Sequence, residues 1–262
     1  MSTMSNTIDP DSTDALHEAL ILPDWPVRGR VRAVSTTRRG GVSKPPCDSL
    51  NLGYGAQDER EAVTENRRRL RNILTLPAEP AWVQQVHGDT VVAAEDVAAD
   101  EPPAADASVS RTPGLASVVM TADCLPVLFC DREGTTVGAA HAGWRGLVRG
   151  ILPATVTAMD RPPEDLMAWL GPAIGPDVYE VGPEVRESFL DQDPTHGESF
   201  RPSPAGRWLA DLYAIARRQL HGLGVTAVYG GEFCTYSDPD RFYSYRRDGS
   251  SGRMASLIWL AD

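Results

Sequence analysis

The chain has 262 residues, a formal net charge of −11 and a hydrophobic content of 42%. That content is typical of globular proteins, so the chain can bury a sizeable core without disulfide or metal staples. The acidic balance disfavours binding to nucleic acid or to an acidic membrane, because either partner needs a basic face.

No apolar run approaches the roughly 20 residues that a membrane helix requires. No secretory signal is visible near the start of the chain. The four cysteines form no CxxC pair and show no disulfide-scaffold density. We therefore expect a cytoplasmic protein whose thiols are mostly reduced.

Residues 1–23 are predicted to form a mobile tail, with a short helix around 15–20, and residues 24–262 the folded domain. No linker and no internal repeat divides the chain, which favours one domain. Strands that alternate with helices, together with meander-like stretches, favour a mixed sheet over a simple doubly wound fold. In chain order, we predict a strand at 31–37, a helix at 62–74, strands at 81–86, near Ser108, at 115–120, 126–130 and 135–140, a helix at 144–159, a strand at 167–170, helices at 183–189 and 209–220, a strand at 225–229, and a hairpin of 241–247 with 253–259.

Three side chains suited to metal binding lie at the ends of predicted strands or between them. They are His87, Cys124 and His141. A thiolate and two imidazoles suit zinc or copper, and three protein ligands leave a coordination position for water or substrate. The same trio could instead be a cysteine nucleophile with a histidine base. Because the three lie far apart in the sequence, either function requires the fold to bring them together.

Each candidate also has a purely structural interpretation. Cys124 could be a buried structural thiol, as Cys130 in its apolar run is predicted to be. His141 could be a buried histidine with satisfied hydrogen bonds, although its small neighbours leave room for it to face a cavity. Arg145, near a predicted helix start, could bind an anionic group such as phosphate or form a structural ion pair.

Together these segments resemble the bacterial YfiH family, also called the laccase-domain or polyphenol-oxidase-like family. The resemblance runs in order through nearly all of residues 31–260. It rests on Ser35-Thr36-Thr37-Arg38-Arg39-Gly40-Gly41-Val42-Ser43, Leu50-Asn51-Leu52-Gly53, Gln85-Val86-His87-Gly88, Thr121-Ala122-Asp123-Cys124-Leu125-Pro126, His141-Ala142-Gly143-Trp144-Arg145-Gly146, Gly171-Pro172-Ala173-Ile174-Gly175-Pro176, Val181-Gly182 and Phe242-Tyr243-Ser244-Tyr245-Arg246-Arg247-Asp248.

The resemblance implies an α+β fold in a single domain, a mixed β sandwich flanked by helices in four αββα layers. It implies a metal ion, zinc or alternatively copper, bound by His87, Cys124 and His141. It also implies a purine nucleoside phosphorylase, with nucleoside and phosphate as substrates, that cleaves methylthioadenosine and deaminates adenosine as well. The sequence does not depart from the family pattern at the three metal positions.

The implied reactions point to further candidate residues. Deamination needs an acid that protonates the departing ammonia, and Asp123, next to the ligand cysteine, is a candidate. Phosphorolysis needs cationic partners for phosphate, for which Arg145 is the first candidate and Arg39 and Arg247 are further ones. Asn51 is expected to contact ribose or base.

Three alternatives stay open. A metal-free cysteine hydrolase would use Cys124 to attack an amide bond, such as one in a cell-wall precursor peptide, with His141 or His87 as base. Phenol oxidation at several copper centres needs many histidines, and the chain has five, so only a mononuclear copper oxidase stays chemically possible. A non-enzymatic metal-binding or partner-binding protein is the third, and it predicts no turnover. The sequence does not predict an oligomeric state.

Overall fold

The structure, a computed structural model, describes residues 19–27 and 29–261. Its longer elements alternate between strands and helices, as the sequence predicts. The strands are β1 (Leu20–Ile21), β2 (Val31–Thr36), β3 (Val91–Ala93), β4 (Ala107–Ser110), β5 (Ser117–Thr121), β6 (Leu125–Asp131), β7 (Val137–Ala142), β8 (Leu166–Leu170), β9 (Glu180–Val181), β10 (Phe200–Pro202), β11 (Trp208–Ala210), β12 (Ala227–Gly230) and β13 (Met254–Leu260). The helices are α2 (Arg60–Ile73), α3 (Trp144–Arg149), α4 (Ile151–Met159), α5 (Pro183–Leu190), α6 (Leu212–Gly222) and α7 (Tyr245–Asp248), with 3-10 turns η1 (Ala94–Asp96), η2 (Pro163–Asp165) and η3 (Pro194–Ser199).

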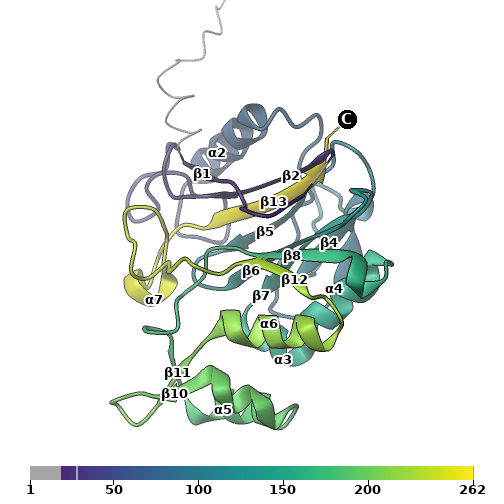
Figure 1. Cartoon of the computed structure of the whole chain (residues 1–262). Helices are drawn as coiled ribbons and strands as arrows, with labels where there is room; N and C mark the ends of the chain where they lie inside the picture. Colours follow the sequence, from purple (N-terminus) through teal and green to yellow (C-terminus); the bar gives the residue numbers. More distant parts are fainter. Residues whose placement is uncertain (1–18, 28, 262) are drawn as a thin grey trace, which may run out of the picture.

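Two sheets stacked face to face form the centre of the molecule (Figure 1). One has the strand order β1-β2-β13-β5, and the other has the order β12-β8-β6-β7-β4-β3. Apolar side chains from both sheets, including Val119, Leu128, Trp169 and Ile258, form one buried cluster between them. β6 and β7 are buried along their whole length, as expected for strands covered on both faces.

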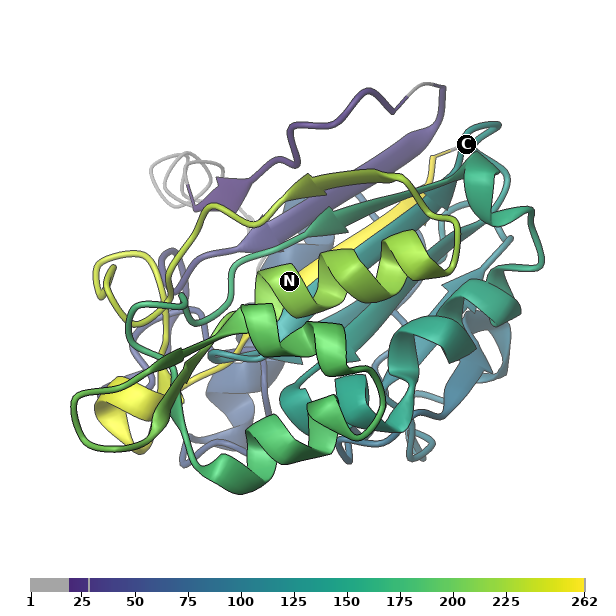
Figure 2. The same cartoon turned by 60° about the horizontal axis from the view of Figure 1, so that its bottom comes forward.

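Helices cover the outer face of each sheet, which makes four αββα layers. α2 buries Leu70 in a cluster with Val34 and Leu257 of the four-stranded sheet. α4 and α6 cover the six-stranded sheet on the other side (Figure 2), and Ile151 of α4 is fully buried there. The predicted fold class, a single-domain mixed β sandwich flanked by helices, is confirmed.

A small third sheet extends this body at one end. β10, β11 and β9 pair in that order, and α5 lies beside them at the bottom of Figure 1. α5 anchors this unit to the core through buried Val185 and Phe189.

The predicted strand at 81–86 is wrong. This segment makes only isolated bridges, Ala81 to Ser117 and Gln84 to Ala104. A side chain takes the place of a strand partner here, because the Gln85 amide accepts from the Met120 N–H and donates to the Met120 carbonyl, at 2.7 and 2.8 Å. The segment is buried at Ala81, Trp82 and Val83 and becomes accessible from Gln84 onward, without the alternation of a paired strand.

The predicted continuous helix at 144–159 is divided in two. Gly150 has φ 100°, and this left-handed residue ends α3 before α4 begins at Ile151. Glycine adopts such a conformation without the steric cost that a side chain would bring.

The predicted C-terminal hairpin is also wrong. β13 lies between β2 and β5 and is antiparallel to both. The other half of the predicted hairpin ends in the short helix α7, whose start Ser244 caps by accepting from the Arg247 N–H.

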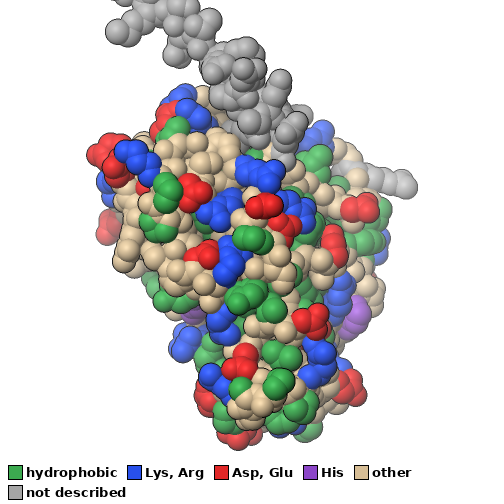
Figure 3. All heavy atoms as spheres, turned by 90° about the vertical axis from the view of Figure 1, so that its left-hand side faces the viewer, with side chains coloured by type: hydrophobic (Ala, Val, Ile, Leu, Met, Phe, Trp, Pro, Cys, Tyr) green, Lys and Arg blue, Asp and Glu red, His purple; other side chains and the backbone are tan. Residues whose placement is uncertain are grey.

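Part of the predicted N-terminal tail belongs to the fold, since β1 pairs with β2. Residues 1–18, including most of the predicted short helix, lie outside the described residues. Within the described part of the chain, none of the helices combines the length and the apolar character needed to cross a membrane. The face in Figure 3 carries basic and acidic side chains interspersed, without a continuous basic stripe.

The packing between the sheets predicts a sharp contrast between two leucines. Leu128 is fully buried between the sheets, whereas Leu22 is 72% exposed. Leu128→Ala should lower the free energy of unfolding by about 2–5 kcal/mol because it leaves a cavity in a closely packed core. Leu22→Ala should change it by less than about 0.5 kcal/mol. Urea unfolding of both variants tests this, and equal effects would contradict the described core.

Candidate metal centre

The register of β6 and β7 brings Cys124 and His141 together. In this antiparallel pair, Pro126 lies opposite His141, so Cys124, which directly precedes β6, lies beside the end of β7. His87 approaches from a separate loop, with its Nε2 3.9 Å from the Cys124 Sγ. The ligand atoms of these three side chains all lie within 4.8 Å of one another, and they could hold a metal ion.

The carboxylate of Asp106 connects the two histidine-bearing segments. Its Oδ1 accepts from His141 Nδ1 at 2.8 Å and from the His87 backbone N–H at 2.9 Å. Its Oδ2 accepts from the backbone N–H groups of Gly88 and Val86, at 2.7 and 3.1 Å. One fully buried side chain therefore fixes the His87 loop against the end of β7.

Asp106 also decides which nitrogen His141 presents to the centre. Because Nδ1 carries the proton that is donated to Asp106, Nε2 is left with its lone pair for a ligand. Burial opposes ionisation of Asp106, but the hydrogen bonds from His141 and the backbone amides outweigh it and lower its pKa. The carboxylate is thus ionised at neutral pH and orients the imidazole.

His87 is held in a conformation that its residue type rarely adopts. Its φ is 58°, in the left-handed region that costs a non-glycine residue free energy. Besides the bond from its N–H to Asp106, its carbonyl accepts from Arg149 Nη1 at 2.8 Å. Two charged groups, the Asp106 carboxylate at the N–H and the Arg149 guanidinium at the carbonyl, therefore stabilise this backbone.

Gly143 leaves the space into which the cysteine and His87 fit. A Cβ built on Gly143 would lie 2.9 Å from Cys124 Sγ and 3.3 Å from His87 Cδ2. Any other residue at this position would push into the ligand cluster. The glycine of the His141-Ala142-Gly143 segment is therefore required by the close approach.

Electrostatics favours a thiolate at Cys124. Burial alone would raise the pKa of this thiol, but His141 and then His87 outweigh it and lower the pKa to about 6. Burial likewise opposes the charged form of His141, yet the Cys124 thiolate and Asp106 raise the pKa of the imidazole. Without a metal, the two side chains therefore attract each other as an ion pair.

The residues fit a single metal ion. A tetrahedral zinc ion with ordinary Zn–S and Zn–N bond lengths separates its sulfur and nitrogen ligands by about 3.6 Å. The observed 3.9 Å between Cys124 Sγ and His87 Nε2 is close to that value. His87 is exposed and Cys124 half-buried, so the cluster is open to solvent on one side.

Asp123 shapes the turn that presents Cys124. Its φ is 93°, and both carboxylate oxygens are occupied. Oδ1 accepts from the Thr235 hydroxyl and Oδ2 from the Arg246 backbone N–H, each at 2.7 Å. The side chain predicted as an acid thus holds the turn to the C-terminal segment.

Two arginines that stack on aromatic rings lie near the cluster. Arg145 is exposed and stacks on Trp144, with its guanidinium carbon 4.4 Å from the ring centroid. Arg246 lies over the ring of Tyr179 at 5.2 Å. Burial raises the pKa of the Tyr179 hydroxyl, the Cys124 thiolate acts in the same direction, and Arg246 and Arg145 oppose it. The Cys124 thiolate and the two guanidinium groups therefore all influence the ionisation of Tyr179.

The other predicted substrate residues make hydrogen bonds to residues that are not part of the candidate metal centre. Arg39 donates to the Asp240 carbonyl. Arg247 donates to the carbonyls of Thr235, Tyr236 and Phe242 and pairs with Asp248. Asn51 is fully buried. Its side-chain Nδ2 donates to the Gly53 carbonyl and the Asp58 carboxylate, and its Oδ1 accepts from the backbone N–H groups of Gly53 and Arg253. The structure gives Arg247 and Asn51 bracing roles in the C-terminal and 51–58 loops.

Two residues of this region were not indicated by sequence patterns. Asp106 lies in a stretch rich in Ala, Asp and Pro that is typical of a loop, and nothing in its spacing connects it to His141. Tyr179 lies between the Gly171–Pro176 segment and Val181-Gly182, but a single tyrosine there carries no local signal of its own.

Comparison with known proteins finds relatives that match nearly the whole chain. Residues 32–261 match the family described as multi-copper polyphenol oxidoreductase laccase. A Pseudomonas aeruginosa protein named purine nucleoside phosphorylase is 55% identical over 245 residues, covering 93% of this chain and 99% of its own. Purine nucleoside phosphorylase YfiH of Escherichia coli is 52% identical over 243 residues, covering 92% and 98%.

Two solved structures share this fold over nearly the whole chain. A crystal structure of a Neisseria meningitidis protein superposes with a TM-score of 0.90 at 50% identity, covering 93% of this chain and 100% of that one. The crystal structure of YlmD from Geobacillus stearothermophilus gives 0.86 at 33% identity, covering 93% and 97%.

The position of Asp106 predicts its effect on metal affinity. Asp106→Asn keeps the size of the side chain but removes the charge that fixes the His141 tautomer and the His87 loop. Zinc affinity, measured by competition with a chromophoric chelator, should fall about 10–100-fold. Asp89→Asn is the matched control, because Asp89 is exposed two residues from His87. If both variants bind zinc like the unmodified protein, Asp106 does not position the ligands.

The lowered pKa of Cys124 predicts the pH dependence of its alkylation. In metal-free protein, the rate of iodoacetamide reaction at Cys124 should fall as pH drops through about 6, since only the thiolate reacts. Burial raises the pKa of Cys47 and raises that of Cys130 to about 12, so both should stay unmodified. Peptide mass spectrometry with Cys124→Ser as control measures this. A Cys124 rate that rises only above pH 8 would contradict the ion pair with His141.

Proposed function

The chain belongs to the multi-copper polyphenol oxidoreductase laccase family, and we propose that it is a metal-dependent purine nucleoside phosphorylase. The relatives that carry this name align over nearly the whole chain. We extend the proposal to cleavage of methylthioadenosine and deamination of adenosine, as the family resemblance implies. The four cysteines are free, which supports the expected location in the reducing cytoplasm.

One observation carries the proposal. A single Asp106 carboxylate orients His141 and the His87 loop around Cys124, and the positive charges of Arg145 and Arg246 act on Tyr179 together with the Cys124 thiolate. A structural thiol would need neither an oriented pair of imidazoles nor an open, cationic approach. This arrangement suits a centre that binds an anionic substrate beside a metal ion.

His87, Cys124 and His141 would hold the metal, with zinc as the first choice and copper as the second. The ion would supply Lewis acidity at the solvent-facing side of the cluster. In phosphorolysis, the bond between the purine nitrogen and the ribose C1′ breaks, and a phosphate oxygen forms the new bond to C1′. The protein must therefore hold phosphate next to the ribose and stabilise the charge that develops on the purine.

Arg145 is the residue that we assign to phosphate. It is exposed, it is next to the ligand-bearing end of β7, and its guanidinium is supported by the ring of Trp144. A planar guanidinium on an aromatic support offers two parallel N–H donors to phosphate oxygens. Arg246 lies close enough to Tyr179 to add positive charge to the same opening.

Tyr179 is the residue that we assign to the purine. Burial keeps its hydroxyl protonated, because it raises the pKa above the ordinary value. The hydroxyl can thus donate a hydrogen bond to a purine nitrogen and stabilise the leaving base. Asp123 positions the turn rather than transferring protons, since both of its oxygens already accept hydrogen bonds.

The family description mentions several copper ions and phenol oxidation. In the described residues, His87, Cys124 and His141 form the single group of this kind that could hold a metal. His196 lies against Phe189 in the core, and His221 is exposed at the end of α6. The histidines needed for a second copper centre are therefore missing from this part of the chain, which argues against a multicopper mechanism.

A second candidate function is a metal-free cysteine hydrolase that acts on an amide bond. One observation favours it. The His141 imidazole donates to the Asp106 carboxylate on one side and interacts with the Cys124 thiolate on the other. That order of nucleophile, base and carboxylate is the one that activates cysteine in hydrolases. Cys124→Ala abolishes either activity, but chelation removes only the metal-dependent one.

A nucleoside panel assayed with and without phosphate tests the proposal. Adenosine, inosine and methylthioadenosine should release base only when phosphate is present, and chelation followed by zinc should abolish and restore that release. Loss of ammonia from adenosine without phosphate would establish the deaminase activity. No turnover of any nucleoside by zinc-loaded protein would reject the phosphorylase. Amide hydrolysis that resists chelation and is blocked by iodoacetamide would establish the hydrolase instead.

Replacing Arg145 should affect phosphate more than nucleoside. Arg145→Ala removes a charged hydrogen-bond donor, so the KM for phosphate should rise about tenfold or more, with the KM for nucleoside and the zinc content unchanged. Arg39→Ala is the control, since Arg39 bonds the Asp240 carbonyl. Steady-state kinetics with varied phosphate measures both, and an unchanged phosphate KM in Arg145→Ala would remove Arg145 from the site.

A further inference from the structure

The helix α3 lies against the loop that carries His87 and touches it at positions spaced by three residues. A Cβ built on Gly143, the N-cap of α3, would lie 3.3 Å from His87 Cδ2. A Cβ built on Gly146 would lie 3.2 Å from the Gly88 carbonyl oxygen. At the end of the helix, Arg149 Nη1 donates to the His87 carbonyl at 2.8 Å. Because positions three apart are neighbours on a helix surface, one side of α3 supports this loop.

The peptide that joins His87 to Gly88 is hydrogen-bonded at both ends. Its N–H, on Gly88, donates to Asp106 Oδ2 at 2.7 Å, and its carbonyl, on His87, accepts from Arg149. In a trans peptide these two groups point in opposite directions, so each bond resists rotation of the peptide from its own side. Glycine accepts almost any backbone conformation, which makes the peptide before Gly88 easy to rotate. The bond from Arg149 therefore fixes a peptide that the local sequence leaves free to turn.

His87 depends on such fixation because its own conformation is costly. Its φ of 58° is unfavourable for a residue with a side chain, so the loss of a support lets the backbone return to a favourable region. That change would redirect the His87 ring, whose Nε2 lies 3.9 Å from the Cys124 Sγ. Only the molecules that keep the original arrangement could bind the ion with all three ligands. The apparent metal affinity falls in proportion to that fraction.

The backbone of Arg149 is itself held in place at the end of α3. Two glutamines from outside this helix donate to its last carbonyls. Gln192 donates to the Val148 carbonyl, and Gln219 of α6 donates to the Leu147 carbonyl. The last carbonyls of a helix have no partners within the helix, so these two bonds hold its final turn against fraying. Arg149 therefore reaches the His87 loop from a fixed position.

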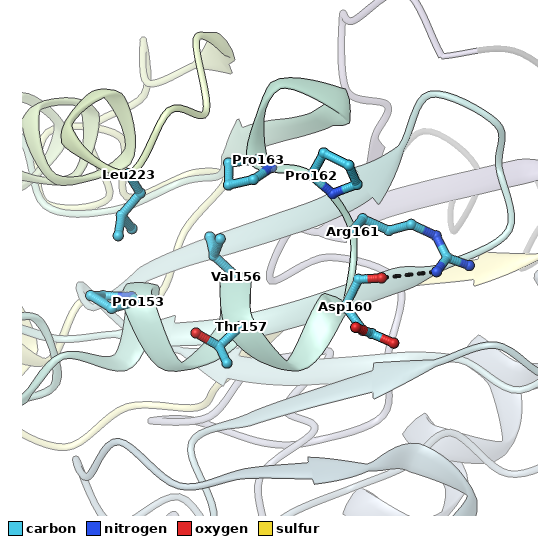
Figure 4. Close-up of a pocket in the computed structure, with 8 residues that line it drawn as sticks. All are labelled: Pro153, Val156, Thr157, Asp160, Arg161, Pro162, Pro163 and Leu223. Carbon is cyan, nitrogen blue, oxygen red and sulfur yellow. Dashed lines mark hydrogen bonds between the residues drawn. The ribbon is translucent and has the colours of Figure 1, made fainter.

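The end of α4 shows the same arrangement away from the metal ligands. Asp160 is also left-handed, with φ 52°, and its carbonyl accepts from Arg161 Nη1 at 2.9 Å, the dashed line in Figure 4. Arg161 additionally pairs with the Asp131 carboxylate. None of the residues that line the hollow in Figure 4 is a candidate metal ligand. Of these two left-handed residues with an arginine on the carbonyl, His87 is the one that carries a ligand.

We propose that Arg149 is a positioning residue of the metal centre, which raises its metal affinity by holding the peptide between His87 and Gly88. Arg149 acts through the His87 backbone and not by contact with the ion. The proposal rests on the metal dependence of the proposed function. It goes beyond that function because it assigns control of the affinity to a residue outside the three ligands, located on a helix that supplies none of them.

Zinc affinity tests the proposal in the full chain. Arg149→Met keeps a long unbranched side chain but removes the donor to the His87 carbonyl. The dissociation constant for zinc, measured by competition with a chromophoric chelator, should rise about tenfold, as for other residues that orient metal ligands. Arg149→Lys should restore most of the affinity, because one bond to a carbonyl needs a single cationic donor and not the guanidinium fork. An unchanged zinc dissociation constant in Arg149→Met would overturn the proposal.

Arg161→Met is the matched control, since it removes the same kind of bond from Asp160. It should lower the stability of the metal-free protein toward urea and leave the zinc dissociation constant unchanged. Arg111→Met takes its place if that variant does not fold, because Arg111 is exposed and donates to two carbonyls at the end of α4. A control that weakens zinc binding as much as Arg149→Met does would mean general destabilisation and would overturn the proposal.

Hydrogen exchange of the metal-free protein, followed by NMR, gives a readout at the loop itself. The amides of His87 and Gly88 donate to Asp106, so they exchange when this loop opens. Arg149→Met should speed their exchange, whereas Arg149→Lys and Arg161→Met should not. Unchanged exchange at these two amides in Arg149→Met would contradict the positioning role. Neither measurement uses a nucleoside, so their failure is distinguishable from failure of the proposed phosphorylase activity.

Discussion

The hydrogen bonds to the buried Asp106 carboxylate are the interaction on which the rest of the site depends. A charge without solvent is stable only when its oxygens are fully bonded. Here three backbone amides and one imidazole satisfy them. The same bonds hold a left-handed His87, set the tautomer of His141 and leave both rings facing Cys124. One side chain therefore both stabilises the His87 backbone and orients the imidazole of His141.

The αββα layers explain why such a carboxylate can exist at that point. β4 pairs with the central strand β7 in the six-stranded sheet, with a second sheet on one face and α4 on the other. Asp106 directly precedes β4, and its own carbonyl accepts from the His141 N–H at 2.7 Å. The register of β4 against β7 therefore positions Asp106 beside His141, while the exposed His87 keeps the cluster accessible.

The sequence predicted the strands of four residues or more, the helices α2, α5 and α6 and the three candidate ligands, because hydrophobic patterning and residue chemistry are local properties; it missed the shorter strands β1, β3, β9, β10 and β11. It failed where a distant partner decided the outcome. Gln85 replaces a strand neighbour through its side chain, and β13 pairs with β2 instead of the segment just before it. Asn51 lies in a distinctive motif, yet burial gives it a bracing role. Asp106 had no local signal, since its importance comes from residues about 20 and 35 positions away.

Arg149 gives His87 a second support, since its guanidinium donates to the His87 carbonyl while Asp106 accepts from the His87 N–H. Both supports matter only if the three ligands bind one ion together. X-ray absorption spectroscopy of protein loaded with one equivalent of zinc tests that claim most directly. The account predicts one sulfur at about 2.3 Å and two imidazole nitrogens at about 2.0–2.1 Å around the zinc ion. A shell without sulfur, or one with two sulfurs, would contradict it.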